Sequence, residues 1–442
     1  YMPEDTPPLP AMLSLGFQQV LTMFPATVLV AVLTKFDVGV TLFTSGLGTI
    51  IALLVAKRRI PLYYGSSFSY ITVFITVMAK YAGNCFNDPS TVYCPDGVRI
   101  AQVGIILTGL FNILFGLLIQ WIGKERLDKV LPPIVTGSVA IIIGIALAGT
   151  ALAQSSTHWG VAFFTLICTI VFSVYLQGKG LLGMLPILLG AVAGYLLSLV
   201  VGIIDFAPIA AADWVRPPNF TFPAFGDGRA WGMALSVALI AIATIPESTA
   251  HLYQMSLYID QLAKDLKRKP TEIKGLIGLN LVADGSNDVI AGLFGGCAGT
   301  NYGENNSLMA ITRNYSGPVL IAAGVIAMLL GFVGKLAAIV ETLPTAVTGG
   351  LSIFLFGIIA LQGVALIQSE KVDMFDPRQL AIGAVILIIG IGGSAFPGGN
   401  LPIHVPGLAV AFPDGLPAIA TSAVIGILLN AIFIIFPPKA KD

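Results

Sequence analysis

The chain has 442 residues, of which 56% are hydrophobic and only 10% are charged, and its mean hydropathy is +0.89. A soluble globular protein of this length is far less apolar, so the composition excludes that class and indicates an integral membrane protein. The 23 basic and 23 acidic residues cancel, which gives no support for a nucleic-acid partner or an acidic protein partner.

Apolar segments follow one another along the whole chain. A helix needs roughly 20 apolar residues to cross a bilayer. We therefore predict an all-α integral membrane protein with about fourteen transmembrane segments. The predicted spans are 11–33, 39–55, 62–79, 100–122, 131–153, 160–177, 181–204, 231–256, 275–295, 298–312, 316–340, 343–366, 379–394 and 416–436.

The basic residues are distributed unequally between the two sets of loops that fourteen spans create. With the N-terminus in the cytoplasm, seventeen Lys and Arg residues lie in internal loops and six in external loops. Because cytoplasmic loops are enriched in Lys and Arg, this predicts that both termini are cytoplasmic. The internal set includes Lys57, Arg58, Arg59, Lys124, Arg126, Lys129, Lys439, Lys441 and the basic residues of 262–270.

Small polar residues interrupt the third span, which reads YYGSSFSYITVF from Tyr63. The Gly and Ser residues leave the backbone open, and Phe68 lies at the break, where a flat ligand could rest against its ring. An aromatic residue in a membrane protein more often serves packing alone. In the polar loop that follows, Cys85 and Cys94 could form a disulfide if the loop faces an oxidising compartment.

An internal repeat relates the fifth and twelfth spans. The fifth opens LPPIVTGSVAIIIGIAL from Leu131, and the twelfth opens LPTAVTGGLSIFLFGII from Leu343. Because the two units are seven spans apart, an odd number, the two halves have opposite orientations. Inverted repeats are typical of transporters that bind their substrate between discontinuous helices at the membrane midplane. Chance similarity of two short strings is the alternative.

The eighth span carries ionisable residues near its middle, in IPESTAHLYQ at 245–254. Glu247 and His251 are four residues apart, so they lie on one helix face. Pro246 leaves a backbone carbonyl without its helical partner. A carboxylate beside an imidazole can exchange a proton at physiological pH, and intramembrane carboxylates usually mark a transport pathway. A purely structural pair that holds two helices together is the alternative.

The ninth span contains a second acidic pair, Asp284 and Asp288, in VADGSNDVI. These residues could bind a cation, support the site from behind or line a water-filled cavity. We find no nucleophile–base grouping, phosphate loop or metal-ligand spacing in the sequence, so we expect no enzyme activity, no cofactor and no metal.

The tenth span is the most irregular, and it reads CAGTNYGENNSLMAITR from Cys297 to Arg313. Its Gly- and Asn-rich start is a poor helix former, and irregular backbone at membrane depth must be buried in protein or line a cavity. We predict a broken helix that resumes near Glu304, with free backbone N–H groups directed at a ligand. A loop outside the membrane is the alternative.

Motifs in the third, eighth and tenth spans resemble those of the nucleobase–ascorbate transporter (nucleobase:cation symporter 2) family, and most of all those of its bacterial uracil:proton symporters. The motifs are GSSFSY at 65–70, PESTAH at 246–251 and NYGENNSLMAITR at 301–313. The last is similar to the family signature, in which an acidic or amide residue and Asn precede a small residue and a terminal Thr-Arg. The resemblance extends over essentially the whole chain.

The resemblance implies two inverted seven-span repeats, with short strands in broken spans three and ten. Residues 1–128 and 229–342 would form a core domain, and 129–228 and 343–442 a gate domain. Substrate contacts would come from the carboxylates of Glu247 and Glu304 and from the backbone of Phe68 and Gly303, with Tyr302 beside them. The resemblance gives His251 a supporting role. Together with the residues discussed above, our candidates for proton coupling or support are His251, Glu247, Asn305, Asp284, Asp288 and Phe356.

Three positions depart from the family pattern. Ser307 stands where Gly is usual, Gln19 where His is usual, and Phe356 where relatives of the uracil branch have Tyr. Gln19 removes a titratable group and Phe356 removes a hydroxyl. These changes put ligand range, affinity and pH dependence in question.

We therefore predict a multi-pass transporter in the bacterial inner membrane that takes up uracil with protons by alternating access. In the family, an acidic residue at the Glu304 position accompanies uracil transport, and Gln accompanies purine transport. A xanthine or urate permease is the first alternative, and an anion transporter of the same architecture is the second. The expected partners are uracil or a related nucleobase, protons and the lipid bilayer, without nucleic acid. The resemblance also implies a homodimer through the gate domain.

Overall fold

The computed structural model describes residues 1–88, 91–122, 131–405, 412 and 415–436. The predicted boundary between residues 128 and 129 lies outside this part of the chain, and so do Lys124, Arg126, Lys129, Lys439 and Lys441. Seven of the described helices are long and apolar enough to cross a membrane, and four further apolar segments are shorter. The chain is thus a mostly helical membrane protein.

The first half of the chain contains helices that begin close to the predicted span starts. Asp37 caps α2 by accepting a hydrogen bond from Val40 N at 2.8 Å, and Pro133 and Pro186 occupy first turns, where a missing N–H costs nothing. The elements are α1 (Leu9–Thr34), α2 (Val38–Val55), β1 (Tyr64–Ser66), α3 (Ile71–Tyr81), α4 (Gly83–Phe86), α5 (Pro95–Ile122), α7 (Pro133–Ala146), α8 (Ala148–Ser155), α9 (Trp159–Tyr175), α10 (Pro186–Val201) and α11 (Ala207–Ala211).

The second half also follows the predicted spans, with strand β2 and helix α15 in the most irregular one. The elements are α12 (Gly228–Ala238), α13 (Ala241–Asp265), α14 (Ile277–Phe294), β2 (Gly299–Asn301), α15 (Gly303–Thr312), α16 (Gly317–Leu330), α17 (Gly334–Glu341), α18 (Thr345–Ser369), α19 (Pro377–Leu387), β3 (Asn400–Leu401), β4 (Leu416–Pro417) and α20 (Ala418–Ile435).

Three predicted continuous spans are interrupted in the structure. The segment predicted as 231–256 is α12 followed by α13, with the break at Leu239 and Ile240, and Pro246 lies inside α13. The segment 316–340 divides into α16 and α17 because the chain turns at Gly331 and Val333 pairs with Val215. The segment 131–153 divides into α7 and α8. The strand pair β3–β4 was not predicted.

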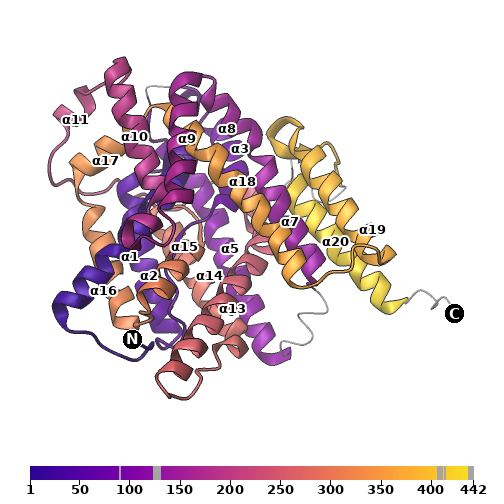
Figure 1. Cartoon of the computed structure of the whole chain (residues 1–442). Helices are drawn as coiled ribbons and strands as arrows, with labels where there is room; N and C mark the ends of the chain where they lie inside the picture. The colour runs from indigo at the N-terminus through magenta and orange to yellow at the C-terminus, as the bar shows by residue number, and fades with distance from the viewer. Residues whose placement is uncertain (89–90, 123–130, 406–411, 413–414, 437–442) are drawn as a thin grey trace.

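The helices pack in two sets (Figure 1). Helix α14 lies along α5, α16 lies along α1 and α2, and α12 lies on α5, whereas α18 packs on α7, α8 and α9 and α19 packs on α20. Glycines allow the close approach in both sets. A Cβ on Gly109 would lie 2.5 Å from the Gly285 carbonyl oxygen, and one on Gly363 would lie 2.5 Å from the Gly137 carbonyl oxygen. Small residues at such contacts are the usual means of packing helices in a bilayer.

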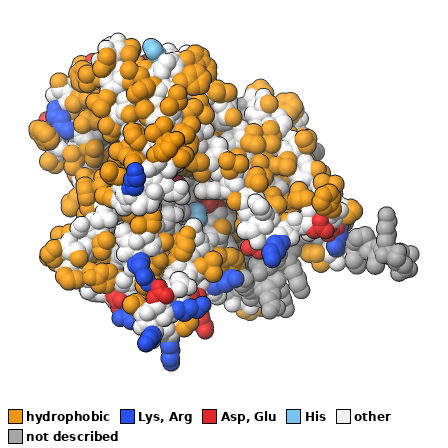
Figure 2. Space-filling view, in the orientation of Figure 1, with side chains coloured by type: hydrophobic (Ala, Val, Ile, Leu, Met, Phe, Trp, Pro, Cys, Tyr) orange, Lys and Arg blue, Asp and Glu red, His pale blue; other side chains and the backbone are white. Residues whose placement is uncertain are grey.

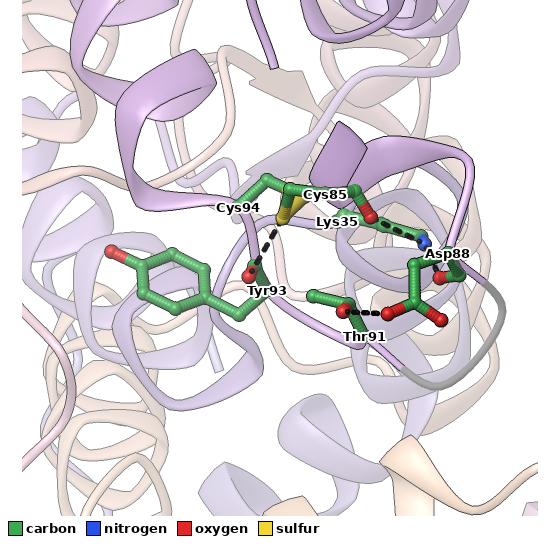
Figure 3. The surroundings of a disulfide bond; sticks show 6 residues. All are labelled: Lys35, Cys85, Asp88, Thr91, Tyr93 and Cys94. Carbon is green, nitrogen blue, oxygen red and sulfur yellow. Dashed lines mark hydrogen bonds between the residues drawn. A yellow bond between two sulfur atoms is a disulfide. The ribbon is translucent and has the colours of Figure 1, made fainter. Parts of the chain in front are cut away.

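A disulfide between Cys85 and Cys94 closes the loop that joins α3 to α5 (Figure 3). The loop is also tied to the end of α1, because Lys35 Nζ donates to the Asp88 carbonyl at 2.6 Å and Cys94 N donates to the Lys35 carbonyl at 3.0 Å. The bond that the sequence permitted is therefore present, in a loop anchored by further contacts.

Replacing both Cys85 and Cys94 by Ala should lower the free energy of unfolding of the purified protein by about 2–3 kcal/mol, as loop-closure entropy predicts for so short a loop. Thermal or denaturant unfolding in detergent measures this. The Cys168→Ala variant is the control, because Cys168 is a free cysteine. Equal stability of the double variant and the control would show that the disulfide contributes nothing.

Candidate functional site

Strands β1 and β2 pair antiparallel and bring the two interrupted spans together. Tyr64 faces Asn301, Gly65 faces Thr300 and Ser66 faces Gly299. Further backbone bonds extend the pairing at both ends, from Ser67 N to the Ala298 carbonyl and from Tyr302 N to the Tyr63 carbonyl. Helix α15 begins directly after β2, and Tyr302 gives it no side-chain cap, so the N–H groups of its first turn are open to a ligand.

Polar side chains of neighbouring helices hold each strand. Ser45 Oγ of α2 donates to the Tyr64 carbonyl at 2.6 Å, and Thr49 Oγ1 accepts from Tyr64 N at 3.0 Å. On the other strand, Gly299 N donates to Asp288 Oδ1 at 2.7 Å. All these groups are buried, so each hydrogen bond satisfies a backbone group that would be costly to leave unpaired.

Tyr302 crosses from one strand to the other. Its hydroxyl lies 3.0 Å from Thr27 Oγ1 and donates to the Ser66 carbonyl at 2.8 Å. Gly65 makes room for the ring, because a Cβ there would lie 2.6 Å from Tyr302 Cζ. The predicted site residue Tyr302 is therefore buried as a brace between the strands.

His251 of α13 is oriented by Asn301. Its Nδ1 lies 2.8 Å from Asn301 Oδ1 and 2.9 Å from the Asn301 carbonyl oxygen. Because both oxygens can only accept a hydrogen bond, Nδ1 is assigned as the protonated nitrogen. Asn301 Nδ2 donates to Ser248 Oγ at 2.8 Å, and Asn280 Nδ2 of α14 donates to the same hydroxyl at 2.8 Å. On the other side, a Cβ on Gly303 would lie 2.8 Å from His251 Nε2.

The Glu247 carboxylate lies between the two interrupted spans. Ser69 Oγ, just after Phe68, donates to Glu247 Oε2 at 3.5 Å. His251 and Glu304 both interact with this carboxylate electrostatically. The direct pairing expected between Glu247 and His251 is replaced by a longer-range interaction, because the hydrogen-bonded nitrogen of His251 is directed at Asn301.

Glu304 is exposed and Phe68 and Glu247 are half-buried, so these three groups are accessible to a ligand. Figure 2 shows acidic and histidine side chains in a hollow near the middle of an otherwise apolar face. The ring of Phe356 from α18 meets Phe68 edge to face at 6.0 Å between centroids. Phe356 was predicted as a supporting residue. It brings α18, which packs on α7, α8 and α9, into contact with Phe68.

Gln19, which stands where the family usually has His, contacts Asn305. Asn305 Nδ2 donates to Gln19 Oε1 at 2.7 Å and to the Gln19 carbonyl at 2.9 Å, and both residues are buried. Asn305 therefore supports α15 against α1. Ser307 Oγ donates to the Gly303 carbonyl at 3.0 Å, so the extra hydroxyl of this departure is satisfied within α15.

The two aspartates of α14 differ in their partners, although both are fully buried. Asp288 binds strand β2, because it accepts a hydrogen bond from Gly299 N, and it also accepts one from Asn112 Nδ2 at 3.3 Å. Neither oxygen of Asp284 has a hydrogen-bond partner in the part of the chain that the structure describes. Asp288 therefore supports β2 from behind, whereas Asp284 is a buried carboxyl group with no hydrogen bond to the described residues.

Sequence reasoning missed four residues that position this site: Ser69, Ser248, Asn301 and Thr27. Ser248 and Asn301 lie next to predicted residues, and their polarity at membrane depth was an available signal. Thr27 lies in an apolar stretch of α1, where nothing in the sequence distinguishes it from other hydroxyl residues that bond to their own helix.

The arrangement can hold a small polar ring by hydrogen bonds. Carboxylates accept hydrogen bonds from ring N–H groups, and open backbone N–H groups donate to ring carbonyls. Within the described residues, no group of three or more His, Cys, Asp and Glu side chains could hold a metal ion.

Comparison with known proteins gives a consistent result. The sequence model of a family described as a permease family matches residues 10–399. A uracil permease of Bacillus caldolyticus is 38% identical over 99% of this chain and 96% of its own length. A uracil permease of Bacillus subtilis (strain 168) is 35% identical over 99% of this chain and 95% of its own length.

Among solved structures, the transmembrane domain of a cyanobacterium bicarbonate transporter is similar in fold. It gives a TM-score of 0.56 at 16% identity and covers 96% of this chain and 97% of its own. At so low an identity, the similarity concerns the fold alone.

Proposed function

The chain belongs to the permease family whose sequence model matches residues 10–399, and from that membership we propose that it takes up uracil in symport with protons. It is a multi-pass nucleobase transporter and not an enzyme. We propose that the transported nucleobase is uracil and that the coupling ion is a proton, and we assign residues that bind each of them.

The observation that carries the proposal is the position of Glu247 and Glu304 beside the open first turn of α15. Uracil is a flat neutral ring with two N–H donors and two carbonyl acceptors. The two carboxylates would accept from the N–H groups, and backbone N–H groups near Gly303 and Phe68 would donate to the carbonyls. A site built this way discriminates against rings that lack those groups, since its own polar groups would then stay unpaired.

The same pair of carboxylates suggests how a proton is coupled to uracil. Two negative charges near one small ring repel each other, and adding a proton to one of them removes the repulsion. Proton and uracil would then bind favourably together and be released together on the inner side. We assign the proton to Glu247, with His251 beside it. Asp284 is the alternative carrier, because it is a buried carboxyl group with no hydrogen-bond partner among the described residues.

Alternating access requires one part of the molecule to move against another. We propose that the core domain (1–128 and 229–342) moves against the gate domain (129–228 and 343–442), with about fourteen spans in two inverted repeats and both termini in the cytoplasm. The contact between Phe68 and Phe356 would be broken and remade in this movement. A homodimer through the gate domain is part of the same proposal.

Ligand specificity can be tested directly on the purified protein. Because a ligand that binds only the folded state raises apparent stability, uracil should increase the midpoint of thermal unfolding in detergent, whereas xanthine and urate should leave it unchanged. In proteoliposomes, an imposed inward proton gradient should increase the initial rate of uracil uptake. Stabilisation by xanthine instead of uracil would identify a purine permease, and electrogenic anion flux would identify an anion transporter.

A further inference from the structure

A basic pocket lies on the membrane face that carries the N-terminus, away from the substrate site. It has a volume of about 330 Å³, and Lys57, Arg58 and Arg59 line it together with the N-terminal residues Pro3 and Glu4. Thr271 and Ile273, from the connection between α13 and α14, complete its lining. The pocket therefore joins three segments that are far apart in the sequence.

The three cations are held close together by the backbone. They follow the last turn of α2, where Arg58 N bonds to the Leu53 carbonyl at 2.7 Å and Lys57 N bonds to the Leu54 carbonyl at 3.0 Å. Lys57 and Arg58 both have positive φ, 52° and 56°, which is uncommon for side chains of this size. Ile60, buried at 1% exposure, then fixes the chain behind them.

None of the three cationic side chains has an ion pair or hydrogen bond to another residue within the described ranges. All three are exposed. Glu4, the one carboxylate in the lining, is 3.8 Å from Arg268, which also binds Asp5 at 2.8 Å. The lining thus has a surplus of positive charge that no ion pair with a described residue neutralises.

A polar group in the lining also lacks a partner. Thr271 Oγ1 is buried and has no hydrogen-bond partner among the residues that the structure describes, although Thr271 N donates to Asp260 Oδ1 at 3.3 Å. A buried hydroxyl without a partner is costly, and a phosphate oxygen would accept its hydrogen bond. This observation is independent of the charge and points to the same type of ligand.

Apolar surface begins immediately next to the pocket. Leu54, one turn before Arg58, is 55% exposed, and Leu9 of α1, close after Glu4, is 61% exposed. In a membrane protein such surface contacts acyl chains, so the cations lie at the level of the lipid headgroups. Figure 2 shows this change from a mostly apolar face to a cluster of charged side chains at the end of the molecule that carries the N-terminus.

We propose that this pocket binds the headgroup of an anionic phospholipid, with the phosphate between Lys57, Arg58 and Arg59 and in reach of the Thr271 hydroxyl. The acyl chains extend along the exposed apolar surface near Leu54. Bound lipid then links the start of the chain, the segment that leads into β1 and the segment that leads into α14. The proposal does not depend on which nucleobase is transported.

Native mass spectrometry of the full chain in detergent, titrated with phosphatidylglycerol or phosphatidylcholine, tests the proposal. The wild-type protein should retain one phosphatidylglycerol in preference to phosphatidylcholine. The variant Lys57→Gln/Arg58→Gln/Arg59→Gln should bind phosphatidylglycerol at least about tenfold more weakly, since each basic residue near a membrane surface contributes severalfold to binding of anionic lipid. The conservative variant Thr271→Val should weaken binding severalfold and leaves the charge unchanged.

The matched control is Lys264→Gln/Lys267→Gln/Lys269→Gln, which removes the same charge from the end of α13 and the residues after it but not from the pocket. The control should bind phosphatidylglycerol as the wild type does. An equal loss of phosphatidylglycerol binding in both triple variants would overturn the proposal. Unchanged binding in the pocket triple variant, or in Thr271→Val, would overturn it as well. Full displacement of the lipid by millimolar inorganic phosphate would also overturn it, because the pocket would then be a site for a soluble anion. If the triple variant does not fold, Arg59→Gln and Thr271→Val supply the same comparison.

Discussion

Replacing Glu304 by Gln should weaken uracil binding by roughly 10- to 100-fold, the effect of losing one hydrogen bond to a charged group. Glu304 is in the first turn of α15, is exposed, and interacts electrostatically with Glu247. The amide keeps the size of the side chain but loses the charge and one acceptor oxygen. Uracil titrations followed by thermal unfolding, or by direct binding to the purified protein, measure the change.

The fold should tolerate this substitution, because Glu304 is exposed and the amide has the same size. The loss of a negative charge from the first turn of α15 should cost only about 0.3–1 kcal/mol of stability. Glu370→Gln is the matched control: it removes the same charge from an exposed glutamate after the end of α18 and should leave uracil binding unchanged. Wild-type affinity for uracil in Glu304→Gln would contradict the assignment of this residue to the substrate.

Replacing Glu247 by Gln should reduce proton-driven uracil uptake in proteoliposomes to background, because the amide cannot bind and release the coupled proton. The amide occupies the same half-buried position beside Ser69 but cannot change its charge. Exchange of internal for external uracil needs no net proton movement, so exchange should persist at a reduced rate. Parallel measurements of gradient-driven uptake and of exchange separate the proton role from the binding role.

Ser69→Ala is the informative comparison, because it removes the 3.5 Å contact to Glu247 and leaves the carboxylate titratable. It should retain gradient-driven uptake, with a modest change in rate. Accumulation of uracil by Glu247→Gln against its gradient would refute Glu247 as the proton carrier. Loss of accumulation in Asp284→Asn together with its retention in Glu247→Gln would transfer the role to the buried carboxyl group of α14.

The sequence predicted the position of most helices because apolar length is set by the bilayer and not by details of packing. It also predicted that the spans at Gly65 and at Gly299 are irregular, and strands β1 and β2 are present there. The family resemblance that three short motifs indicated is confirmed by the match over residues 10–399. The breaks at Leu239 and Gly331 were missed, because both lie inside stretches that remain apolar throughout.

The candidate site was predicted as a set of residues but not as an arrangement. Glu247, His251, Tyr302 and Glu304 are brought together, as expected from two interrupted spans that meet. The sequence suggested that His251 pairs with Glu247, since four residues separate them on one helix. Instead, Asn301 holds the ring, because a strand from another span presents an amide and a carbonyl closer to Nδ1.

The sequence by itself determined the class of protein, the placement of its apolar segments and the polar groups that must be stabilised at membrane depth. A buried carboxylate or an irregular backbone is too costly in a bilayer to be accidental, so single residues carry information there. The tertiary structure alone decided which polar groups form hydrogen bonds with one another. Asp288 accepts from Gly299 N, Gln19 accepts from Asn305, and Asp284 has no hydrogen-bond partner among the described residues. These pairings join residues 11 to 286 positions apart, and hydrogen-bond geometry across such separations depends on the packing of whole helices, which no local pattern encodes.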